Sequence, residues 1–335
     1  MDDRHVTLAH GNGGRFMREL IEEIFLRHLG NAHLDATLDA APLRLPPGRD
    51  VMVTTDAFTV QPLEFPGGDI GSLAVNGTVN DLAVSGAEPL FLTLNAVIEE
   101  GLAVETLERI VASLARAAQS VGVAVVAGDT KVVPRGQGGG VYLATTGIGL
   151  RIGDRRIGLD LIRTGDRILV SGPIGDHGIA VMLARESFEL EGSLQSDCAA
   201  VTPLTLPLAG IAGLRFMRDP TRGGLATVAH EIAAATGFDL RLIEERVPVR
   251  DAVRSVCEIL GYDPYYLACE GRVVAVAAPE AASAILDLWQ GAPGGGEARI
   301  IGAVEAGEGR VVLETAIGGE RLLHELEDDP LPRIC

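Results

Sequence analysis

The sequence contains few cysteines, and none of them form the close pairs that a zinc site or a disulfide framework needs. Its four cysteines, Cys198, Cys257, Cys269 and Cys335, lie far apart in the chain. Structural zinc sites take their ligands from pairs a few residues apart, so this spacing favours neither zinc nor disulfides. We predict that the first three are buried as small apolar side chains. Cys335 differs from them because it is the last residue.

Positive charge is also scarce, and arginine carries almost all of it. The chain has 28 Lys and Arg against 46 Asp and Glu, a formal net charge of -18, and Lys131 is its only lysine. Such an acidic protein repels nucleic acid and anionic membranes, so we expect neither as a partner. A lone lysine indicates either a position that needs a compact, flexible cation or chance survival.

Long apolar runs and the usual nucleotide-binding fingerprints are missing as well. No stretch is apolar enough to span a bilayer, and the first residues lack a secretory signal pattern, so we expect a cytoplasmic protein. There is no Walker A motif and no G-x-G-x-x-G turn after a strand. Any phosphate site must therefore be built in another way.

Hydrophobic periodicity predicts a mixed α/β (α+β) fold with two domains. With 335 residues, 47% of them hydrophobic, the chain can bury a core in each half. In the first half we expect helices at 17–28, 71–85 and 107–121, a buried strand at 51–55, and further strands at 91–97, 123–127 and 141–148. In the second half we expect helices at 179–186, 225–235 and 249–260, and strands at 167–171, 240–243, 273–278, 300–304 and 311–314. The predicted division is 1–40 for a glycine-rich loop and helix, 41–152 for an N-terminal domain, 153–318 for a C-terminal α/β domain and 319–335 for a flexible tail.

Acidic side chains stand at the ends of predicted elements, beside glycine or other small residues. The candidates are Asp56, Asn80-Asp81, Asp129 with Lys131, and Asp219. Mg²⁺ prefers oxygen ligands and often bridges carboxylates to nucleotide phosphates, while a nearby lysine compensates the charge of the transferred group. Taken together, the candidates predict a metal and phosphate cradle. Each alone is read more simply as a helix cap or a turn residue.

Further motifs run along nearly the whole chain. They are residues 9–14 (AHGNGG), 54–56 (TTD), 65–71 (FPGGDIG), 77–87 (GTVNDLAVSGA), 128–133 (GDTKVV), 175–178 (GDHG), 218–224 (RDPTRGG), 270–271 (EG) and the terminal PRIC. Through them the chain resembles the HypE family, the carbamoyl dehydratases of hydrogenase maturation. That family lies within the superfamily of aminoimidazole-ribonucleotide synthetase, selenophosphate synthetase and thiamine-phosphate kinase. The terminal tetrapeptide is the most specific motif, because a C-terminal cysteine separates this family from its kinase and synthetase relatives.

The resemblance implies an aminoimidazole-ribonucleotide-synthetase-like architecture and a homodimer in which the N-terminal domains pair their sheets. It also implies ATP and Mg²⁺ as cofactors, and it assigns roles to individual residues. Those for Mg²⁺ are Asp56, Asp81 and Asp129. Those for ATP are His10, Gly11, Gly13, Gly14, Asn80, Lys131 and Asp219. Those for catalysis are Cys335, Glu270 as proton acceptor and Lys131 as phosphate contact.

The implied reaction takes place on the terminal thiol. A carbamoyltransferase, HypF, would load Cys335, ATP would phosphorylate the carbamoyl oxygen, and loss of phosphate would leave a thiocyanate. A HypC–HypD complex would then receive the cyano group for the NiFe hydrogenase. Two alternatives stay open: a small-molecule kinase or synthetase of the same superfamily, and a non-catalytic maturation scaffold.

Overall fold

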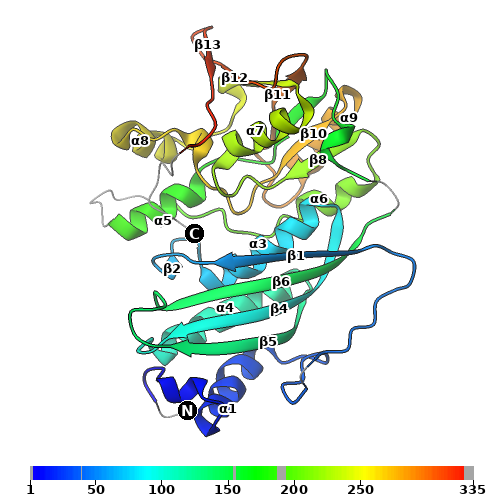
Figure 1. Cartoon of the computed structure of the whole chain (residues 1–335). Coiled ribbons are helices and arrows are strands. Elements are labelled where there is room, and N and C mark those ends of the chain that lie inside the picture. The colour runs from blue at the N-terminus through cyan, green and yellow to red at the C-terminus, as the bar shows by residue number, and fades with distance from the viewer. Residues whose placement is uncertain (1–2, 39, 154–155, 187–193, 328–335) are drawn as a thin grey trace. The chain divides into compact units, whose positions relative to one another are not determined.

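A computed structural model of the protein describes residues 3–38, 40–153, 156–186 and 194–327; Cys335 lies outside the described residues. The described chain divides into two compact units (Figure 1). Unit 1 contains residues 3–82 and 88–151, and unit 2 contains residues 83–87 and 152–327. Among the described helices, none is both long enough and apolar enough to cross a membrane.

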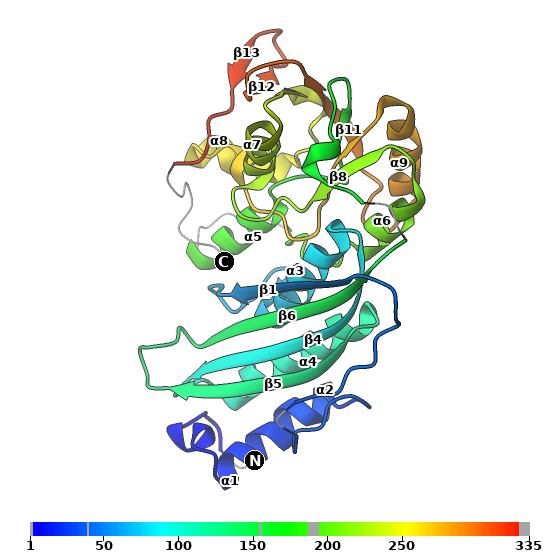
Figure 2. The ribbon, with the colours of Figure 1, turned by 45° about the vertical axis from the view of Figure 1, so that its right-hand side comes forward.

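Unit 1 is built on a four-stranded sheet in the order β1-β6-β4-β5. Strand β1 is antiparallel to β6, and β4 is parallel to β5. Figures 1 and 2 show helices α3 and α4 on one face of this sheet. The elements are β1 Val51–Phe58, β2 Glu64–Phe65, β3 Gly68–Asp69, α3 Ile70–Val84, β4 Ala87–Glu99, α4 Val104–Ser120, β5 Ala124–Val133 and β6 Val141–Arg151.

Side chains of the sheet alternate between a buried face and an open face, as the strand period of two requires. On β4 the buried positions are Leu92, Leu94, Ala96 and Ile98. On the open face, Val53 of β1 is 64% exposed. The sequence-based prediction that residues 51–55 form a buried strand is therefore wrong, because β1 alternates and continues to Phe58. A strand with one open face leaves its outward apolar side chains in contact with solvent.

A helical segment precedes the sheet, at the position that the sequence predicts. It consists of η1 Leu8–Gly11, α1 Arg15–Leu20, the π-helical turn η2 Ile21–Leu26 and α2 Arg27–Leu29. Leu20 and Ile24, which lie one turn apart, are buried. This spacing gives the segment one apolar stripe that packs against the rest of unit 1.

Unit 2 contains a seven-stranded sheet in the order β13-β12-β9-β11-β7-β10-β8. Its strands are β7 Arg167–Val170, β8 Leu214–Arg218, β9 Asp239–Ile243, β10 Val274–Ala277, β11 Arg299–Glu305, β12 Val311–Glu314 and β13 Glu320–Leu322. Its α-helices are α5 Asp176–Glu186, α6 Thr202–Thr205, α7 Gly224–Thr236, α8 Asp251–Leu260 and α9 Pro279–Gly291. Its 3₁₀ helices are η3 Leu159–Leu161, η4 Leu206–Gly210, η5 Glu244–Arg246 and η6 Pro264–Tyr266.

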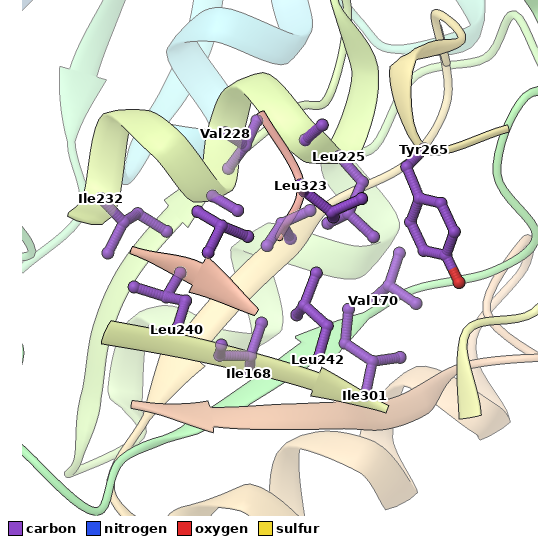
Figure 3. Packing of buried hydrophobic residues seen from close by; sticks show 14 of the residues in the cluster. Ile168, Val170, Leu225, Val228, Ile232, Leu240, Leu242, Tyr265, Ile301 and Leu323 are labelled. Carbon is purple, nitrogen blue, oxygen red and sulfur yellow. The ribbon is translucent and has the colours of Figure 1, made fainter. Parts of the chain in front are cut away.

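The two faces of this sheet carry two separate apolar cores. Ile168 and Val170 of β7 pack with helix α7 on one face, as Figure 3 shows. Leu169, between them in sequence, belongs to the cluster on the other face, with Trp289 of α9. The indole Nε1 of Trp289 donates a hydrogen bond to the carbonyl oxygen of Leu204 at 2.8 Å. A strand buried on both faces explains why residues 167–171 read as a continuous apolar run.

Several elements of unit 2 have no counterpart in the sequence-based prediction, namely α6, α9, β8 and β13. Helix α9 begins with Pro279 at a position where a missing N–H costs nothing. Strand β13 and the residue after it also revise the expected tail of residues 319–335. Leu323 is 2% exposed and belongs to the core around α7 (Figure 3). The chain is therefore still part of unit 2 at Leu323.

The cysteine prediction holds for two of the three described cysteines. Cys257 and Cys269 are buried free thiols, whereas Cys198 is partly exposed. Burial raises the pKa of the Cys257 thiol to about 11, and it raises that of Cys269 well above its ordinary value. These two thiols therefore stay protonated and unreactive near neutral pH.

A close helix crossing in unit 1 gives the first testable prediction. An alanine methyl at Gly71 would overlap the backbone carbonyl oxygen of Ile110, whereas at Gly291 it would meet open space. We expect G71A to lower the free energy of unfolding by about 1–3 kcal/mol, because α4 must move. G291A is the control, with an expected gain of up to about 1 kcal/mol from helix propensity. Urea denaturation measures both, and a G71A protein as stable as wild type would contradict the crossing.

Buried His177 on α5 gives a prediction for pH. The side chain is fully buried, and burial lowers its pKa to about 3. The unfolded chain binds this proton near pH 6.5 while the folded chain does not, so stability falls as the pH drops from about 6.5 toward 3. Between pH 7 and pH 5 we expect wild type to lose about 2 kcal/mol more than H177N. Urea titrations at both pH values test this, and equal losses in the two proteins would refute it.

Candidate active site

Asp56 and Asp81 lie on the same face of the unit 1 sheet. The Oδ2 atom of Asp81, on α3, accepts a hydrogen bond from the Thr54 hydroxyl of β1 at 2.8 Å. Asp56 is two residues beyond Thr54, so its side chain leaves the same face of the strand, roughly 7 Å further along. Both carboxylates are partly exposed. The structure therefore places these two predicted ligands beside each other.

Close packing of α3 on β1 and β6 holds this pair in place. A methyl group at Gly77 would come within 2.7 Å of the Phe58 ring, and one at Gly147 would come within 2.8 Å of Thr78. Asn80, on the same helix, is only 1% exposed. The amide to which the resemblance assigns an ATP contact is thus largely shielded from solvent.

Asp129 and Lys131 lie on the opposite, open face of the sheet. In β5 they alternate with Val132, which is buried, and both are exposed. Their partners in β4 are Asn95 and Val97, which alternate with the buried positions of that strand. The sequence places Asp129 and Lys131 after a strand ending at residue 127, but β5 continues to Val133. Pairing with β4 sustains it through Gly128.

The predicted cradle is therefore not assembled within one chain. Strands β1 and β5 are the two edges of the sheet, three strand spacings apart, which amounts to about 14 Å. Within the described residues, no group of three or more His, Cys, Asp or Glu side chains could hold one metal ion. Asp56 and Asp81 on one face, and Asp129 with Lys131 on the other, are two separate groups of charged side chains.

The glycine-rich loop at the N-terminus is anchored by its histidine. His10 is fully buried; its Nδ1 accepts a hydrogen bond from the Thr7 N–H at 3.1 Å, and its ring packs against Phe16. Gly11 lies so close to Val132 of β5 that a methyl group would come within 2.8 Å. Gly13 has a φ of 78°, a conformation that favours glycine. The loop is thus fixed at His10 and Gly11, while Gly13 is exposed and Gly14 is partly exposed.

Glu270 of unit 2 lies in a tightly packed loop before β10. It is 5% exposed, and its backbone N–H donates to Asp197 Oδ1 at 3.0 Å. The preceding residue, Cys269, donates its N–H to the carbonyl oxygen of Pro220 at 3.0 Å. The environment of Glu270 is therefore set by the segments around Asp197 and Pro220.

The motif at residues 218–224 links this loop to the root of the C-terminal arm. Asp219 is 5% exposed. A methyl group at Gly224, where φ is 60°, would come within 2.5 Å of the Leu267 carbonyl oxygen. On the other side, a methyl group at Gly223, where φ is 75°, would overlap the Thr227 hydroxyl oxygen at 2.1 Å and would lie in ordinary contact with Leu326 at 3.5 Å. Only glycine lets the turn lie between the Glu270 loop and the arm.

Two hydrogen bonds fasten the root of the arm itself. His230 contacts the carbonyl oxygen of Leu323 through Nε2 at 2.9 Å, and the Tyr266 hydroxyl donates to the carbonyl oxygen of His324 at 2.7 Å. Cys335, which the sequence assigns to catalysis, lies outside the described residues. The structure therefore fixes where the arm starts, and the sequence gives eight further residues from 328 to Cys335.

Two residues beside Glu270 are not among the candidates from the sequence. They are Asp197 and Arg272. Arg272 is 8% exposed, and its Nε lies 3.3 Å from Asp197 Oδ2. A charged residue directly before the apolar run at 273–278 is a signal for Arg272. We see no comparable signal for Asp197, whose segment has no periodic pattern.

Comparison with known proteins relates both units to one family. Residues 37–151 match the model of the AIR synthase related protein N-terminal domain, and residues 163–314 match that of the C-terminal domain. Carbamoyl dehydratase HypE of Azotobacter vinelandii is 48% identical over 332 residues, which cover 98% of this chain and 97% of that protein.

Solved structures agree with the sequence comparison. A structure of the hydrogenase maturation protein HypE in complex with ATP superposes with a TM-score of 0.94 at 43% identity, covering 98% of this chain and 99% of that one. A structure of a HypE–HypF complex contains a chain that matches with a TM-score of 0.81 at 43% identity, covering 92% of this chain and 99% of that one. The chain belongs to the HypE family of carbamoyl dehydratases.

Proposed function

We propose that this protein uses ATP to dehydrate a carbamoyl group carried on the thiol of Cys335, which gives a protein-bound thiocyanate. The observation that carries the proposal is the position of the arm root beside the Gly223–Gly224 turn, which also contacts the loop that holds Glu270. Residues 328–335, extended at about 3.3 Å each, span roughly 26 Å. This length supports the proposal that the terminal thiol reaches Glu270 while the arm stays rooted.

The reaction needs activation of a poor leaving group, followed by elimination. The carbamoyl oxygen attacks the γ-phosphorus of ATP, the bond to the ADP oxygen breaks, and an O-phosphorylated carbamoyl forms. The C–O bond then breaks, phosphate leaves with the bonding electrons, and the nitrogen loses both of its protons. One proton goes to Glu270, our candidate acceptor, and the other to solvent. The sum is thiocarbamate plus ATP giving thiocyanate, ADP and phosphate.

The carboxylates of unit 1 fit a magnesium site in the chemistry of their donors. Asp56 and Asp81 offer oxygen ligands on one face, in a partly exposed setting where water and phosphate oxygens can complete the coordination. Magnesium there would neutralise phosphate charge during phosphoryl transfer. Asp56 and Asp81 would hold that ion, and through it they would orient the nucleotide phosphates from their side of the sheet.

A second copy of the chain would complete this site. Val53 and Tyr142, on the open face of unit 1, are 64% and 37% exposed, an apolar surface that a homodimer would cover. Asp129 and Lys131 lie on that face too, about 14 Å in strand spacing from Asp56. Because β1 is an edge strand, we infer that a two-fold partner reaches past this edge and supplies its Asp129 and Lys131 to Asp56 and Asp81, with Lys131 contacting the transferred phosphate.

The remaining partners follow from the chemistry and the family. HypF, whose complex with a HypE protein is known, would load the carbamoyl group on Cys335. A HypC–HypD complex would receive the cyano group for the NiFe hydrogenase. A small-molecule kinase or synthetase remains the second candidate enzyme, and a scaffold without turnover the third.

Removal of the terminal thiol tests the proposal directly. In C335A we expect no carbamoylation and no nitrile, while ATP binding and the free energy of unfolding stay as in wild type. C257A is the control, because its thiol is buried in α8. Mass spectrometry of the C-terminal peptide, before and after Mg-ATP, should show a gained carbamoyl group and then the loss of one water. Product formation by C335A would refute the proposal, and ATP turnover insensitive to the tail would favour the small-molecule kinase.

Mixed dimers test whether the site is shared between subunits. We expect D81N and K131A to be inactive separately, whereas a refolded equal mixture regains about a quarter of wild-type activity. Half of the dimers are then mixed, and each has one site without a substitution and one with both. Nitrile formation measured on carbamoylated protein reads this out. A mixture as inactive as its components would place the complete site within one chain.

A further inference from the structure

Asp197 is a buried carboxylate for which the reaction described above has no use. Its side chain is fully buried, although its segment, residues 194–200, has neither helix nor strand. Burial raises the pKa of this carboxyl, and the Arg272 guanidinium and the N–H groups of Glu270 and Gly271 oppose the rise. Removing a carboxylate from water is costly, so its partners indicate why it is there.

The partners of Asp197 are three consecutive residues. Oδ1 accepts the N–H of Glu270 at 3.0 Å, the N–H of Gly271 also donates to the carboxylate, and Oδ2 lies 3.3 Å from Nε of Arg272. A single side chain thus holds the backbone on which the Glu270 carboxylate is mounted.

The segment around Asp197 and the segment at Glu270–Gly271 are in direct backbone contact. A methyl group at Gly271 would overlap the carbonyl oxygen of Asp197. In return, the Ala199 N–H donates to the carbonyl oxygen of Glu270 at 3.4 Å. Because backbone meets backbone here, a shift of the Asp197 segment must shift Glu270.

Arg272 ties this contact to the rest of unit 2. Its Nε donates to the carbonyl oxygen of Pro173 at 2.9 Å, and its Nη1 donates to that of Gly294 at 3.3 Å. Its Nη2 lies 3.5 Å from Asp176 Oδ2. The guanidinium is therefore a fixed point, and Asp197 transmits its position to Glu270.

We propose that Asp197 is a positioning residue that sets the direction in which the Glu270 side chain leaves the backbone. The inference rests on the proposed function, in which Glu270 accepts a proton from the carbamoyl nitrogen. Buried ion pairs can often be replaced by apolar groups without loss of stability. The need to position Glu270 therefore explains the buried Asp197–Arg272 pair better than a gain in stability does. A proton acceptor must lie within hydrogen-bond reach of its proton, and this requirement makes the position of Glu270 matter.

Unit 2 supplies a matched control in Asp239. Its Oδ1 accepts the N–H of Glu308 at 2.8 Å and that of Arg310 at 2.9 Å, and its Oδ2 pairs with the Arg310 guanidinium at 2.8 Å. Burial alone would raise its pKa, but these donors outweigh burial and lower it to about 2. Asp239 makes the same kind of backbone grip as Asp197, between β9 and the turn before β12.

The experiment compares D197N with D239N in the full-length protein carbamoylated at Cys335. Each is given Mg-ATP, and the loss of water from the C-terminal peptide is followed over a single turnover at several ATP concentrations. We expect D197N to slow the maximal rate roughly 100-fold, the cost of displacing a reacting group by about 1 Å. Its half-saturating ATP concentration should stay within about two-fold of wild type, because only a step after binding is affected. D239N should react at the wild-type rate.

The outcomes separate this inference from the proposed function. Equal maximal rates for D197N and D239N would overturn the positioning role while leaving the dehydration intact. A raised half-saturating ATP concentration with an unchanged maximal rate would overturn it as well. If carbamoylated wild type loses no water, both proposals fall together. Should D197N not fold, Asp197→Glu keeps the charge but moves the carboxylate by one methylene, and the same loss of rate is expected.

Discussion

Helix α3 can approach strands β1 and β6 only because glycines stand at the points of contact. Gly77 meets the Phe58 ring and Gly147 meets Thr78, and a methyl group at either position would force the layers apart. The hydrogen bond from Thr54 to Asp81 needs this short separation. The same packing buries one face of the sheet and leaves the other open. The close packing of α3 on one face of the sheet thus accounts both for the position of Asp81 beside β1 and for the exposure of Lys131 on the other face.

In unit 2, loops without regular secondary structure are held in place by side chains. Carboxylates do this at two places, where Asp197 binds the backbone before β10 and Asp239 binds the backbone before β12. In both, the carboxylate accepts backbone N–H groups that no strand or helix satisfies, and an arginine balances the charge. These contacts hold the loop carrying Glu270, although it has neither helix nor strand.

Local pattern was enough to predict most elements of the fold, but not where strands end or which faces are covered. The expected strand at 123–127 stops at Gly128, because glycine and aspartate read as a turn, yet pairing with β4 extends β5 to Val133. Residues 51–55 read as buried because they are apolar, and only the arrangement of layers shows that Val53 is exposed. Thr54 of β1 bonds Asp81 of α3, and Asp56 leaves the same face of β1. Asp129 and Lys131 do not join them within one chain, since sequence spacing does not tell which face of the sheet each side chain occupies. Asp197 could not be found from the sequence, since its meaning lies in a contact with residues more than seventy positions away.

The anchored root of the C-terminal arm has a consequence for how tightly the protein needs to bind its substrate. Because Leu323 is embedded in the core of unit 2, the arm is a tether with a fixed origin. On the proposed function, the carbamoyl group on Cys335 is confined within roughly 26 Å of residue 327, which gives it an effective concentration on the order of 10 mM around its own unit. A carbamoyl group has too few atoms to provide much affinity by contact. Tethering removes the need for that affinity, so even millimolar intrinsic recognition would keep the site substantially occupied.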